Sequence, residues 1–392
     1  MTPSRSTRIK PWHDPKVRAW AFQIAVVALV LWLALSLFSN TLHKMESRGI
    51  RTGFGFLDQT AGYGILFSLI PYDETYSYGR TFFVGLLNTL LVSGLGIVTA
   101  TLVGFVAGVA RLSRNWLVAR LAEVYVEIFR NVPLLLQVFF WYFAVLQALP
   151  APRQSFRFFH DTVYLSKRGL YLPAPVAGEG FGWVLLLALA GLVAAVALGR
   201  WARKRRESTG QEFPVWRAAL GLVVGLPGAL FLLLGAPLSW SVPELRGFNF
   251  AGGGVLLPEL VALWFALTVY TGTFIAEIVR SGIQAVSHGQ TEAAAALGLR
   301  RGQVIRLVVL PQALRVIIPP LTSQYLNLTK NSSLATAIGY PDLVAVFMGT
   351  TLNQTGQAVE VVAMTMAVYL AISLSISAVM NAYNRRVALK ER

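Results

Sequence analysis

Eight long apolar runs divide this sequence, and no other feature constrains its fold as strongly. A helix needs about 20 apolar residues to cross the hydrocarbon layer of a bilayer, where it must satisfy its own backbone hydrogen bonds. The runs of sufficient length are residues 19–38, 82–110, 132–149, 181–199, 218–241, 255–276, 317–338 and 358–383. We therefore predict an all-α fold, a polytopic membrane helical bundle with about eight transmembrane helices.

The composition supports a membrane protein and weakens other classes. The chain is 55% hydrophobic and 13% charged, which is outside the usual range of soluble proteins. A net charge of +16 would suit nucleic acid in a soluble chain, but the basic residues lie mainly between the apolar runs. There is no cysteine, and the four histidines, His13, His43, His160 and His288, never share a helical face. We therefore predict no metal site and no nucleic-acid partner.

The distribution of Lys and Arg predicts the orientation of the chain. Eight spans place both termini on one side, and the segments on that side hold 24 Lys and Arg residues against nine in the opposite loops. Cytoplasmic loops carry the excess of positive charge, so we predict a multi-pass membrane protein with both termini in the cytoplasm. The first run follows five basic residues. It is longer than the apolar region of a cleaved signal, about 7–15 residues, so we predict an uncleaved anchor.

The most informative loop is the predicted cytoplasmic segment 277–316. Helix-forming residues run from 291 to 297, Gly298 interrupts them, and a second helical stretch, 301–310, is followed by Pro311. This pattern predicts two short helices joined at Gly298. Glu292 would lie in the first turn of the first helix, where the helix dipole favours a carboxylate. The alanines after it leave a narrow surface that can fit the groove of a partner.

This segment resembles the hallmark of the membrane subunits of ABC importers: Glu-Ala-Ala, three residues, Gly, nine residues, then an aliphatic residue, any residue, Leu and Pro. The matching residues are Glu292, Ala293, Ala294, Gly298, Val308, Leu310 and Pro311. Val308 stands where isoleucine is common. The resemblance implies that the first helix is a coupling helix, which docks into a cleft of a separate nucleotide-binding subunit. The alternative is an ordinary cytosolic amphipathic hairpin.

Three further blocks resemble the branch of this family that imports polar amino acids such as histidine, glutamate, glutamine, arginine and opines. They are residues 87–90, 127–137 and 330–334. The resemblance implies a five-helix importer core made of the second, third, sixth, seventh and eighth runs. The extra first run and the inserted pair most resemble the larger permeases of general L-amino acid systems.

These observations divide the chain into five parts. Pro- and Gly-rich stretches and a strongly basic segment bracket the fourth and fifth runs as an insertion. The predicted parts are a cytoplasmic N-terminus with an extra anchor helix (1–40), a periplasmic connector (41–80), the first part of the permease core (81–149), an insertion with two extra transmembrane helices (150–254) and the second part of the core with the coupling segment (255–392).

No ATP-binding motif occurs in the chain, which lacks the sequence G-x-x-x-x-G-K followed by Ser or Thr. The ABC resemblance therefore implies that this chain is not itself an enzyme and binds no cofactor. ATP and Mg²⁺ would be held by cytoplasmic ATPase subunits. A second permease subunit, identical or different, and a periplasmic amino-acid-binding protein that delivers the substrate are implied as further partners.

Polar residues within the runs are the candidates for a translocation path. Inserting a charged group at the bilayer centre costs about 2.5–3.5 kcal/mol, so Glu259, Lys330 and Glu360 need an explanation. The two glutamates lie near the outer ends of their predicted spans, and their side chains can reach the membrane interface. The residues that could line a path are Asn88, Gln137, Gln324, Lys330, Asn331 and Ser332, although such side chains also join membrane helices. The main alternative function is an ion-coupled secondary transporter or channel, which would require a relay of intramembrane acids.

Overall fold

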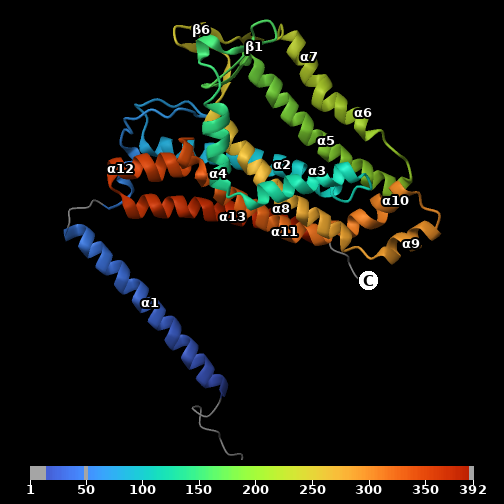
Figure 1. Ribbon diagram of the computed structural model, residues 1–392, viewed down its shortest axis with the longest axis horizontal. Helices are drawn as coiled ribbons and strands as arrows, with labels where there is room; N and C mark the ends of the chain where they lie inside the picture. Colours follow the sequence, from blue (N-terminus) through green and yellow to red (C-terminus); the bar gives the residue numbers. More distant parts are fainter. Residues whose placement is uncertain (1–14, 48–51, 388–392) are drawn as a thin grey trace, which may run out of the picture. The chain divides into compact units, whose positions relative to one another are not determined.

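The computed structural model describes residues 15–47 and 52–387, and the chain is predominantly helical (Figure 1). Within these residues, seven helices are long and apolar enough to cross a membrane, and one bent helix pair would bring the number to eight. The predicted fold class is thus confirmed. The basic residues Arg5, Arg8 and Lys10, which precede the first predicted span, lie outside the described residues. The chain forms two compact units, and each is described by itself.

The first unit comprises the residues up to Ser93 and those from Leu314 onward. Its elements are α1 (Pro15–Ser47), η2 (Phe54–Asp58), the first half of α2 (Tyr78–Ala110), most of α11 (Leu310–Asn331), η7 (Ser332–Ile338), η8 (Val344–Thr351), α12 (Leu352–Thr355) and α13 (Ala358–Val387). A buried cluster joins η2, the start of α2, η8 and α13 through Phe56, Tyr78, Phe347 and Val361. Residues of the predicted connector therefore belong to the packed core of this unit.

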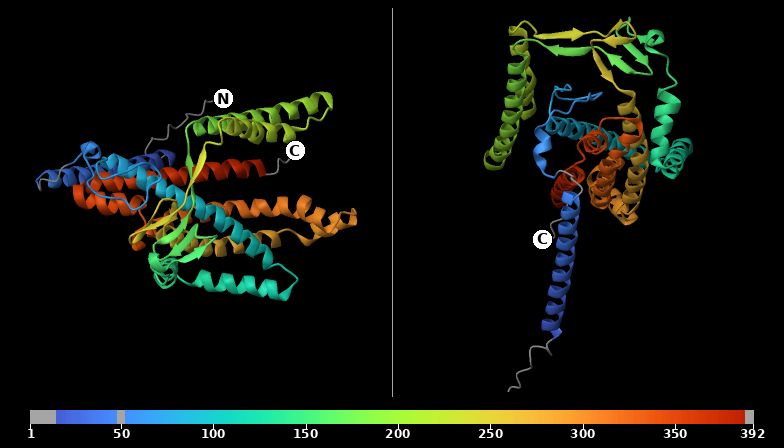
Figure 2. Two further views of the ribbon diagram at one scale, coloured as in Figure 1. Left: turned by 90° about the horizontal axis from the view of Figure 1, so that it is seen from above. Right: turned by 90° about the vertical axis from the view of Figure 1, so that its left-hand side faces the viewer.

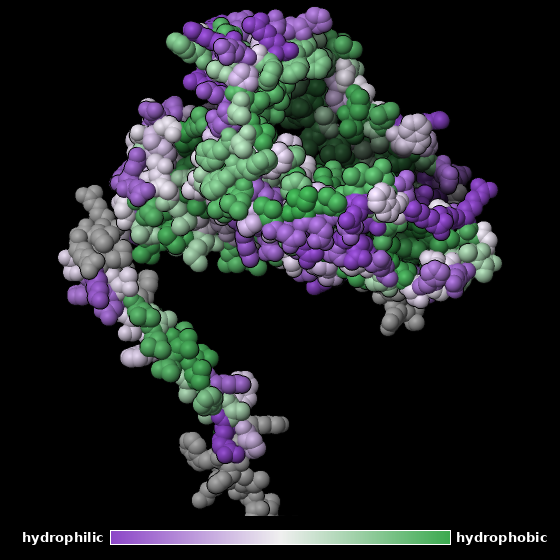
Figure 3. All heavy atoms as spheres, viewed as in Figure 1, coloured by the Kyte–Doolittle hydropathy of each residue, from purple (hydrophilic) through white to green (hydrophobic). Residues whose placement is uncertain are grey.

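Helix α1 is apolar on every side. Large side chains such as Trp20, Phe22, Leu31 and Trp32 are all exposed, and Figure 3 shows an apolar surface along the middle of the helix. A helix that is hydrophobic all round is buried in a membrane or in a large core. Its length and composition therefore suit the predicted anchor.

The second unit runs from Gly94 to Ala313. Besides the second half of α2, its helices are α3 (Trp116–Asn131), α4 (Leu134–Phe139), η3 (Phe140–Leu146), η4 (Pro152–Gln154), α5 (Phe181–Thr209), α6 (Val215–Leu220), η5 (Gly221–Gly225), α7 (Leu226–Leu233), α8 (Pro258–Gln284), α9 (His288–Ala296), α10 (Arg301–Val304) and η6 (Ile305–Val309). Helix α8 packs against α3, α4 and η3. Helix α8 also packs closely against α2, because Gly104 and Gly108 of α2 lack side chains and allow Ile275 and Ala276 of α8 to approach.

A sharp bend separates α3 from the helix that follows it. The axes of residues 116–131 and 134–146 differ by 104°, and Pro133 lies at the break. Proline donates no backbone hydrogen bond and disfavours a helical conformation in the residue before it. The predicted span 132–149 contains the helix of residues 134–146, which passes as a membrane span only together with α3. Most of the expected cytoplasmic connector between the second and third runs is helix α3.

The insertion contains β-structure that the sequence analysis did not predict. The strands are β1 (Phe156–Phe158), β2 (Val163–Ser166), β3 (Gly169–Leu172), β4 (Ala174–Ala177), β5 (Leu238–Ser241), β6 (Glu244–Arg246), β7 (Asn249–Ala251) and β8 (Gly254–Leu256). They pair antiparallel in the orders β1-β2-β3-β8, β4-β5 and β6-β7 (Figure 2). The predicted helix 218–241 is wrong at its end: it stops at Leu233, because Gly235 and Ala236 have positive φ and Pro237 follows.

The two extra spans of the insertion pack against each other. Helix α5 runs beside the continuous helix formed by α6, η5 and α7 (Figure 1), and both are long and apolar enough to cross a membrane. Their backbones approach closely at Gly191, where an added β-carbon would come within 2.1 Å of the Leu222 carbonyl oxygen. Only glycine permits this approach of two backbones.

Candidate functional site

The candidate site is the segment between α8 and α11. Near the end of α8, Glu277 forms ion pairs with Arg111, which directly follows α2, and with Arg280 one turn further along α8. The side chains of Arg111, Glu277 and Arg280 are 14%, 28% and 29% exposed, so their charges attract more strongly than a fully solvated pair. This cluster fixes the end of α8 against the end of α2, a contact that the sequence analysis did not predict.

Helix α9 is the first of the two predicted short helices. It begins at His288, so Glu292 lies in its second turn and not in the first turn, as we predicted. The Glu292 carboxylate contacts Nδ1 of His288 at 3.0 Å. Both side chains are highly exposed, at 70% and 88%, so this contact contributes little to stability. Glu292 therefore stands on the surface, where a partner can reach it.

Gly298 ends α9 through a Schellman motif. Its φ of +77° is a left-handed conformation that glycine adopts without strain. The N–H of Gly298 donates to the Ala295 carbonyl at 2.9 Å, and the N–H of Leu299 donates to the Ala294 carbonyl at 3.3 Å. These two bonds define the motif. The predicted helix break at Gly298 is therefore present.

The second predicted helix does not end before Pro311. It begins as α10 at Arg301, where the Gln303 side chain accepts the Arg300 N–H at 2.9 Å. It then widens into the π-helix η6 and continues as α11 to Asn331. Pro311 has no N–H to donate, and the irregular turn before it accommodates the missing bond. The predicted short helix is thus the start of a long one.

Helix α9 folds back onto the helix that follows it. It packs against α10 and η6, and Nε2 of Gln312 lies 3.4 Å from Oε1 of Gln290. Ala294 is buried, whereas Glu292 and Ala293 are exposed. Of the remaining motif residues, Gly298 is exposed, and Val308, Leu310 and Pro311 are half-buried. The motif therefore supplies both the exposed face of α9 and the helix that supports it.

Leu297 is a surface residue that the sequence analysis did not single out. It directly precedes Gly298 at the end of α9, and it is 83% exposed. Scattered apolar residues are common on surfaces, but this one is the C-cap of the short helix that carries Glu292. The signal in the sequence was a large aliphatic residue between an alanine run and a helix-ending glycine.

Two predicted path residues of the first unit are fully buried. The Asn88 amide donates to the carbonyls of Phe67 at 2.9 Å and Pro341 at 2.8 Å. Ser332 Oγ donates to the Thr329 carbonyl at 2.8 Å. The Asn88 bonds join separate backbone segments, whereas the Ser332 bond is local. The other candidates of this unit lie on α11, where Lys330 is exposed and Gln324 and Asn331 are half-buried; the helix tightens into the 3₁₀ helix η7 directly after Asn331.

Gln137, the path candidate of the second unit, bridges the bend between α3 and α4. Its side chain is buried, and Nε2 donates to the carbonyls of Phe129 at 2.8 Å and Val132 at 2.9 Å. Because Pro133 has no N–H, the Phe129 carbonyl lacks its regular helical partner, and the Gln137 amide supplies one. Gln137 therefore stabilises the bend.

The two intramembrane glutamates have separate local partners. Glu259, in the first turn of α8, accepts the Tyr142 hydroxyl at 2.9 Å. Glu360, in the first turn of α13, accepts the Gly53 N–H at 2.6 Å. A carboxylate is favoured at a helix N-terminus. Each acid therefore has a structural role within its own unit.

Asp342 is a buried acid that the sequence analysis missed. It lies between η7 and η8, outside the candidate spans, and its Oδ1 accepts the Ala345 N–H at 2.8 Å at the start of η8. Its Oδ2 lies 3.5 Å from the Tyr369 hydroxyl. Burial raises the pKa of this carboxyl to about 7. Asp342 therefore caps η8 with a group that titrates near neutral pH.

Known proteins resemble this chain over nearly its whole length. Residues 215–389 match the family described as binding-protein-dependent transport system inner membrane component. The permease protein YhdX of Escherichia coli is 58% identical over 379 residues, which cover 97% of this chain and 96% of YhdX. The general L-amino acid transport system permease protein AapQ of Rhizobium johnstonii is 50% identical over 97% of this chain and 94% of AapQ. A crystal structure of an amino acid ABC transporter with histidines has a TM-score of 0.46 and 20% identity, over 79% of this chain and 95% of that one.

Proposed function

This chain belongs to the inner-membrane permease subunits of amino-acid ABC importers, and we propose that it lines the path of polar L-amino acids and is driven by a separate ATPase. The substrate class is supported by AapQ, whose name assigns it to general L-amino acid transport. The alignments with YhdX and AapQ span 97% of this chain. The anchor helix and the insertion are therefore largely shared with these relatives.

The observation that carries the proposal is the surface of α9. Glu292 on this short helix and Leu297 at its C-cap are highly exposed, and neither contributes to the packing of the second unit. Alanines between them keep the helix narrow. A narrow helix with one charged and one apolar side chain suits a groove on a cytoplasmic ATPase subunit.

The connections of α9 explain how docking would move the spans. Helix α9 rests on α10 and η6, which continue without a break into α11. At its other end, a turn of three residues joins it to α8, whose end is fixed by the Glu277 cluster. A displacement of α9 is therefore passed to both helices. Rigid helices transmit such shifts better than loops.

In the proposed cycle, ATP binding closes the ATPase dimer and pushes α9, and the spans reopen toward the periplasm. A periplasmic binding protein then delivers the amino acid, and ATP with its Mg²⁺ is hydrolysed on the partner. A second permease subunit completes the path. Both termini and α9 face the cytoplasm in this arrangement, which the distribution of basic residues supports.

The path itself is proposed to use the polar end of α11. Lys330 is exposed and Asn331 and Gln324 are half-buried, so these side chains can still reach a substrate. Asn88, Gln137 and Ser332 are buried and bonded to backbone carbonyls. We propose that Asn88 and Ser332, which belong to the same unit as this end of α11, support the backbone around the path.

The proposal is tested by uptake of radiolabelled amino acids into cells that make the intact transporter. Glu292→Lys reverses the charge that faces the ATPase, and we expect uptake to fall at least about tenfold with an unchanged amount of protein in the membrane. Glu207→Lys is the matched control, because Glu207 is also exposed but lies at the end of α5. Equal uptake by the two variants would remove Glu292 from the mechanism.

A further inference from the structure

A basic pocket lies where α5 meets the chain that leads into α6. Its volume is about 470 Å³, within the range of about 300–1,000 Å³ that is common for small-ligand sites. The lining residues are Gly199, Ala202, Arg203, Arg206, Glu212, Phe213 and Val215. The four on α5 are spaced three and four residues apart, so they share one helix face. The small residues leave the space, and the arginines supply its charge.

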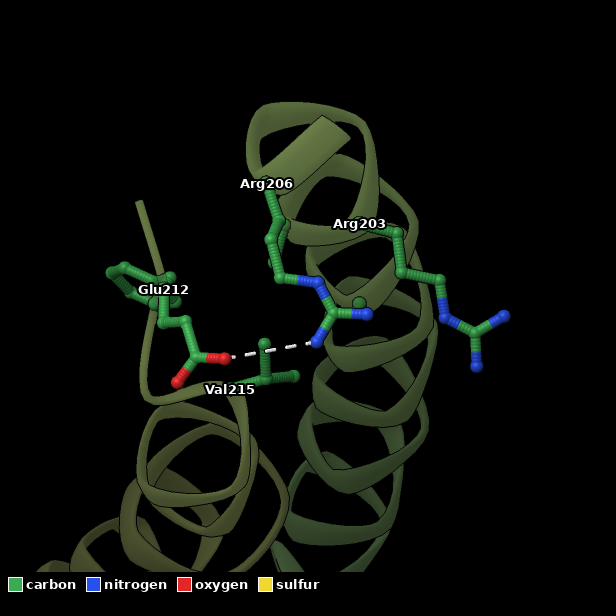
Figure 4. Close-up of a pocket in the computed structure, with 7 residues that line it drawn as sticks. Arg203, Arg206, Glu212 and Val215 are labelled. Atoms are coloured by element: carbon green, nitrogen blue, oxygen red, sulfur yellow. Dashed lines mark ion pairs between the residues drawn. The ribbon is translucent and has the colours of Figure 1, made fainter. Parts of the chain in front are cut away.

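Both arginines have guanidinium N–H groups that are available to donate hydrogen bonds to an anion. Figure 4 shows Arg206 turned toward Glu212 and Arg203 extending freely from α5. The Arg206–Glu212 distance is 3.8 Å, and these side chains are 63% and 83% exposed, so the pair is weak. In the part of the chain that the structure describes, Arg203 has no acidic partner. Guanidinium groups match the oxygens of a phosphate in both charge and geometry.

Aromatic residues place this pocket at a membrane surface. Trp201 packs edge-on against Phe213 at 5.6 Å, and Trp216 is 67% exposed at the start of α6. Tryptophan gathers at the level of the lipid headgroups. Since Trp201 lies between Gly199 and Arg203 in the sequence, the pocket lies at this same level. Earlier in α5, before the pocket residues, the apolar side chains of Leu189 and Val193 are exposed, as lipid contact requires.

We propose that this pocket binds the phosphate group of an anionic phospholipid. Arg203 and Arg206 hold the phosphate, and the acyl chains lie along the apolar surface of α5. The inference rests on the proposed orientation, in which residues 200–217 face the cytoplasm. Six Lys and Arg residues against two Glu in this stretch add a general attraction to anionic lipid, and basic pockets between helices on this side bind anionic headgroups.

The test is native mass spectrometry of the purified, intact transporter titrated with phosphatidylglycerol. In the pocket variant, Arg203→Gln and Arg206→Gln are combined, and we expect lipid binding to weaken roughly 30-fold. In the control variant, Arg200→Gln and Lys204→Gln remove equal charge from the same helix outside the pocket, and most of the binding should remain. An equal loss in both variants would overturn the proposal, since it would show attraction to charge alone.

Two further experiments distinguish a lipid site from a site for free phosphate and test the orientation of the pocket. Excess inorganic phosphate should leave the lipid bound to the wild type, and displacement would show a site for free phosphate. The orientation is tested independently with Ser208→Cys, because the natural chain has no cysteine. A membrane-impermeant maleimide should label this residue only after the cells are opened. Labelling of intact spheroplasts would contradict the proposed orientation and the cytoplasmic lipid site, whatever the lipid titration shows about the pocket itself.

Discussion

Gly104 of α2 lies directly against Ile275 of α8, and an added β-carbon at Gly104 would come within 2.5 Å of the Ile275 β-carbon. It would also lie 2.8 Å from the Gly272 carbonyl oxygen, which is backbone and cannot turn away. We expect Gly104→Ala to force the helices apart and to lower the free energy of unfolding by about 1–3 kcal/mol. The measurement is the apparent unfolding temperature of the purified transporter. Gly94→Ala is the control, because a β-carbon there meets nothing within 4 Å; equal effects would contradict the contact.

Gln137 offers a second prediction, on the bend between α3 and α4. Gln137→Leu keeps a similar volume but removes the donor to the Phe129 and Val132 carbonyls. Each lost hydrogen bond of this kind costs about 0.5–1.5 kcal/mol, so the apparent unfolding temperature should fall. Gln59→Leu changes an exposed glutamine and should have almost no effect. An unfolding temperature for Gln137→Leu that matches wild type would show that the bend does not depend on this amide.

A third prediction concerns the ion pairs at the end of α8. Glu277→Gln leaves Arg111 and Arg280 close together without their shared carboxylate, and we expect a loss of about 1–3 kcal/mol. Glu123→Gln breaks the exposed pair with Arg120 and should cost at most about 1 kcal/mol. Thermal unfolding of both variants measures the difference. Similar losses would mean that the Glu277 cluster is no stronger than a solvated pair.

The fourth prediction concerns the pH dependence of stability and rests on Asp342. Because burial raises the pKa of this carboxyl to about 7, the folded protein binds the proton more tightly than the unfolded chain, whose Asp titrates near about 3.9. Its contribution to stability should therefore decline as pH rises from about 4 to about 7. Asp342→Asn keeps an acceptor for the Ala345 N–H and removes the titration. We expect this variant to gain stability over wild type between pH 5 and pH 8, on the order of 1.4 kcal/mol per pKa unit of the shift.

The apolar runs predicted most of the spans because crossing a bilayer requires length and hydrophobicity, which single segments reveal. The bend at Pro133 was harder to predict. Its proline was visible in the sequence, but its partner Gln137 acts through a fold-dependent contact with the Phe129 carbonyl. The strands of the insertion escaped prediction because pairs such as Leu170 with Leu256 join distant segments, and strands of three or four residues carry almost no periodic signal.

For the candidate site, the residue pattern correctly predicted a helix break at Gly298 but placed Glu292 one turn too early in its helix. The turn at Gly298 followed from glycine's freedom at positive φ. The continuation of the helix through Pro311 did not follow, since no local signal in the sequence indicates the π-turn of η6, which packs against α9. Leu297 was missed because its exposure is a tertiary property, and Asp342 because nothing local in the sequence indicates its burial.

The central claim, that α9 docks on a separate ATPase, is tested most directly by photo-crosslinking from Leu297. A benzophenone side chain is introduced at position 297 in the intact transporter, and membranes are irradiated. Position 233 serves as the control, since Leu233 is equally exposed, at 84%, but ends α7. We predict an adduct with the nucleotide-binding subunit from position 297 and none from position 233. An adduct from 233 alone, or from neither position in a transporter that still hydrolyses ATP, would contradict the account.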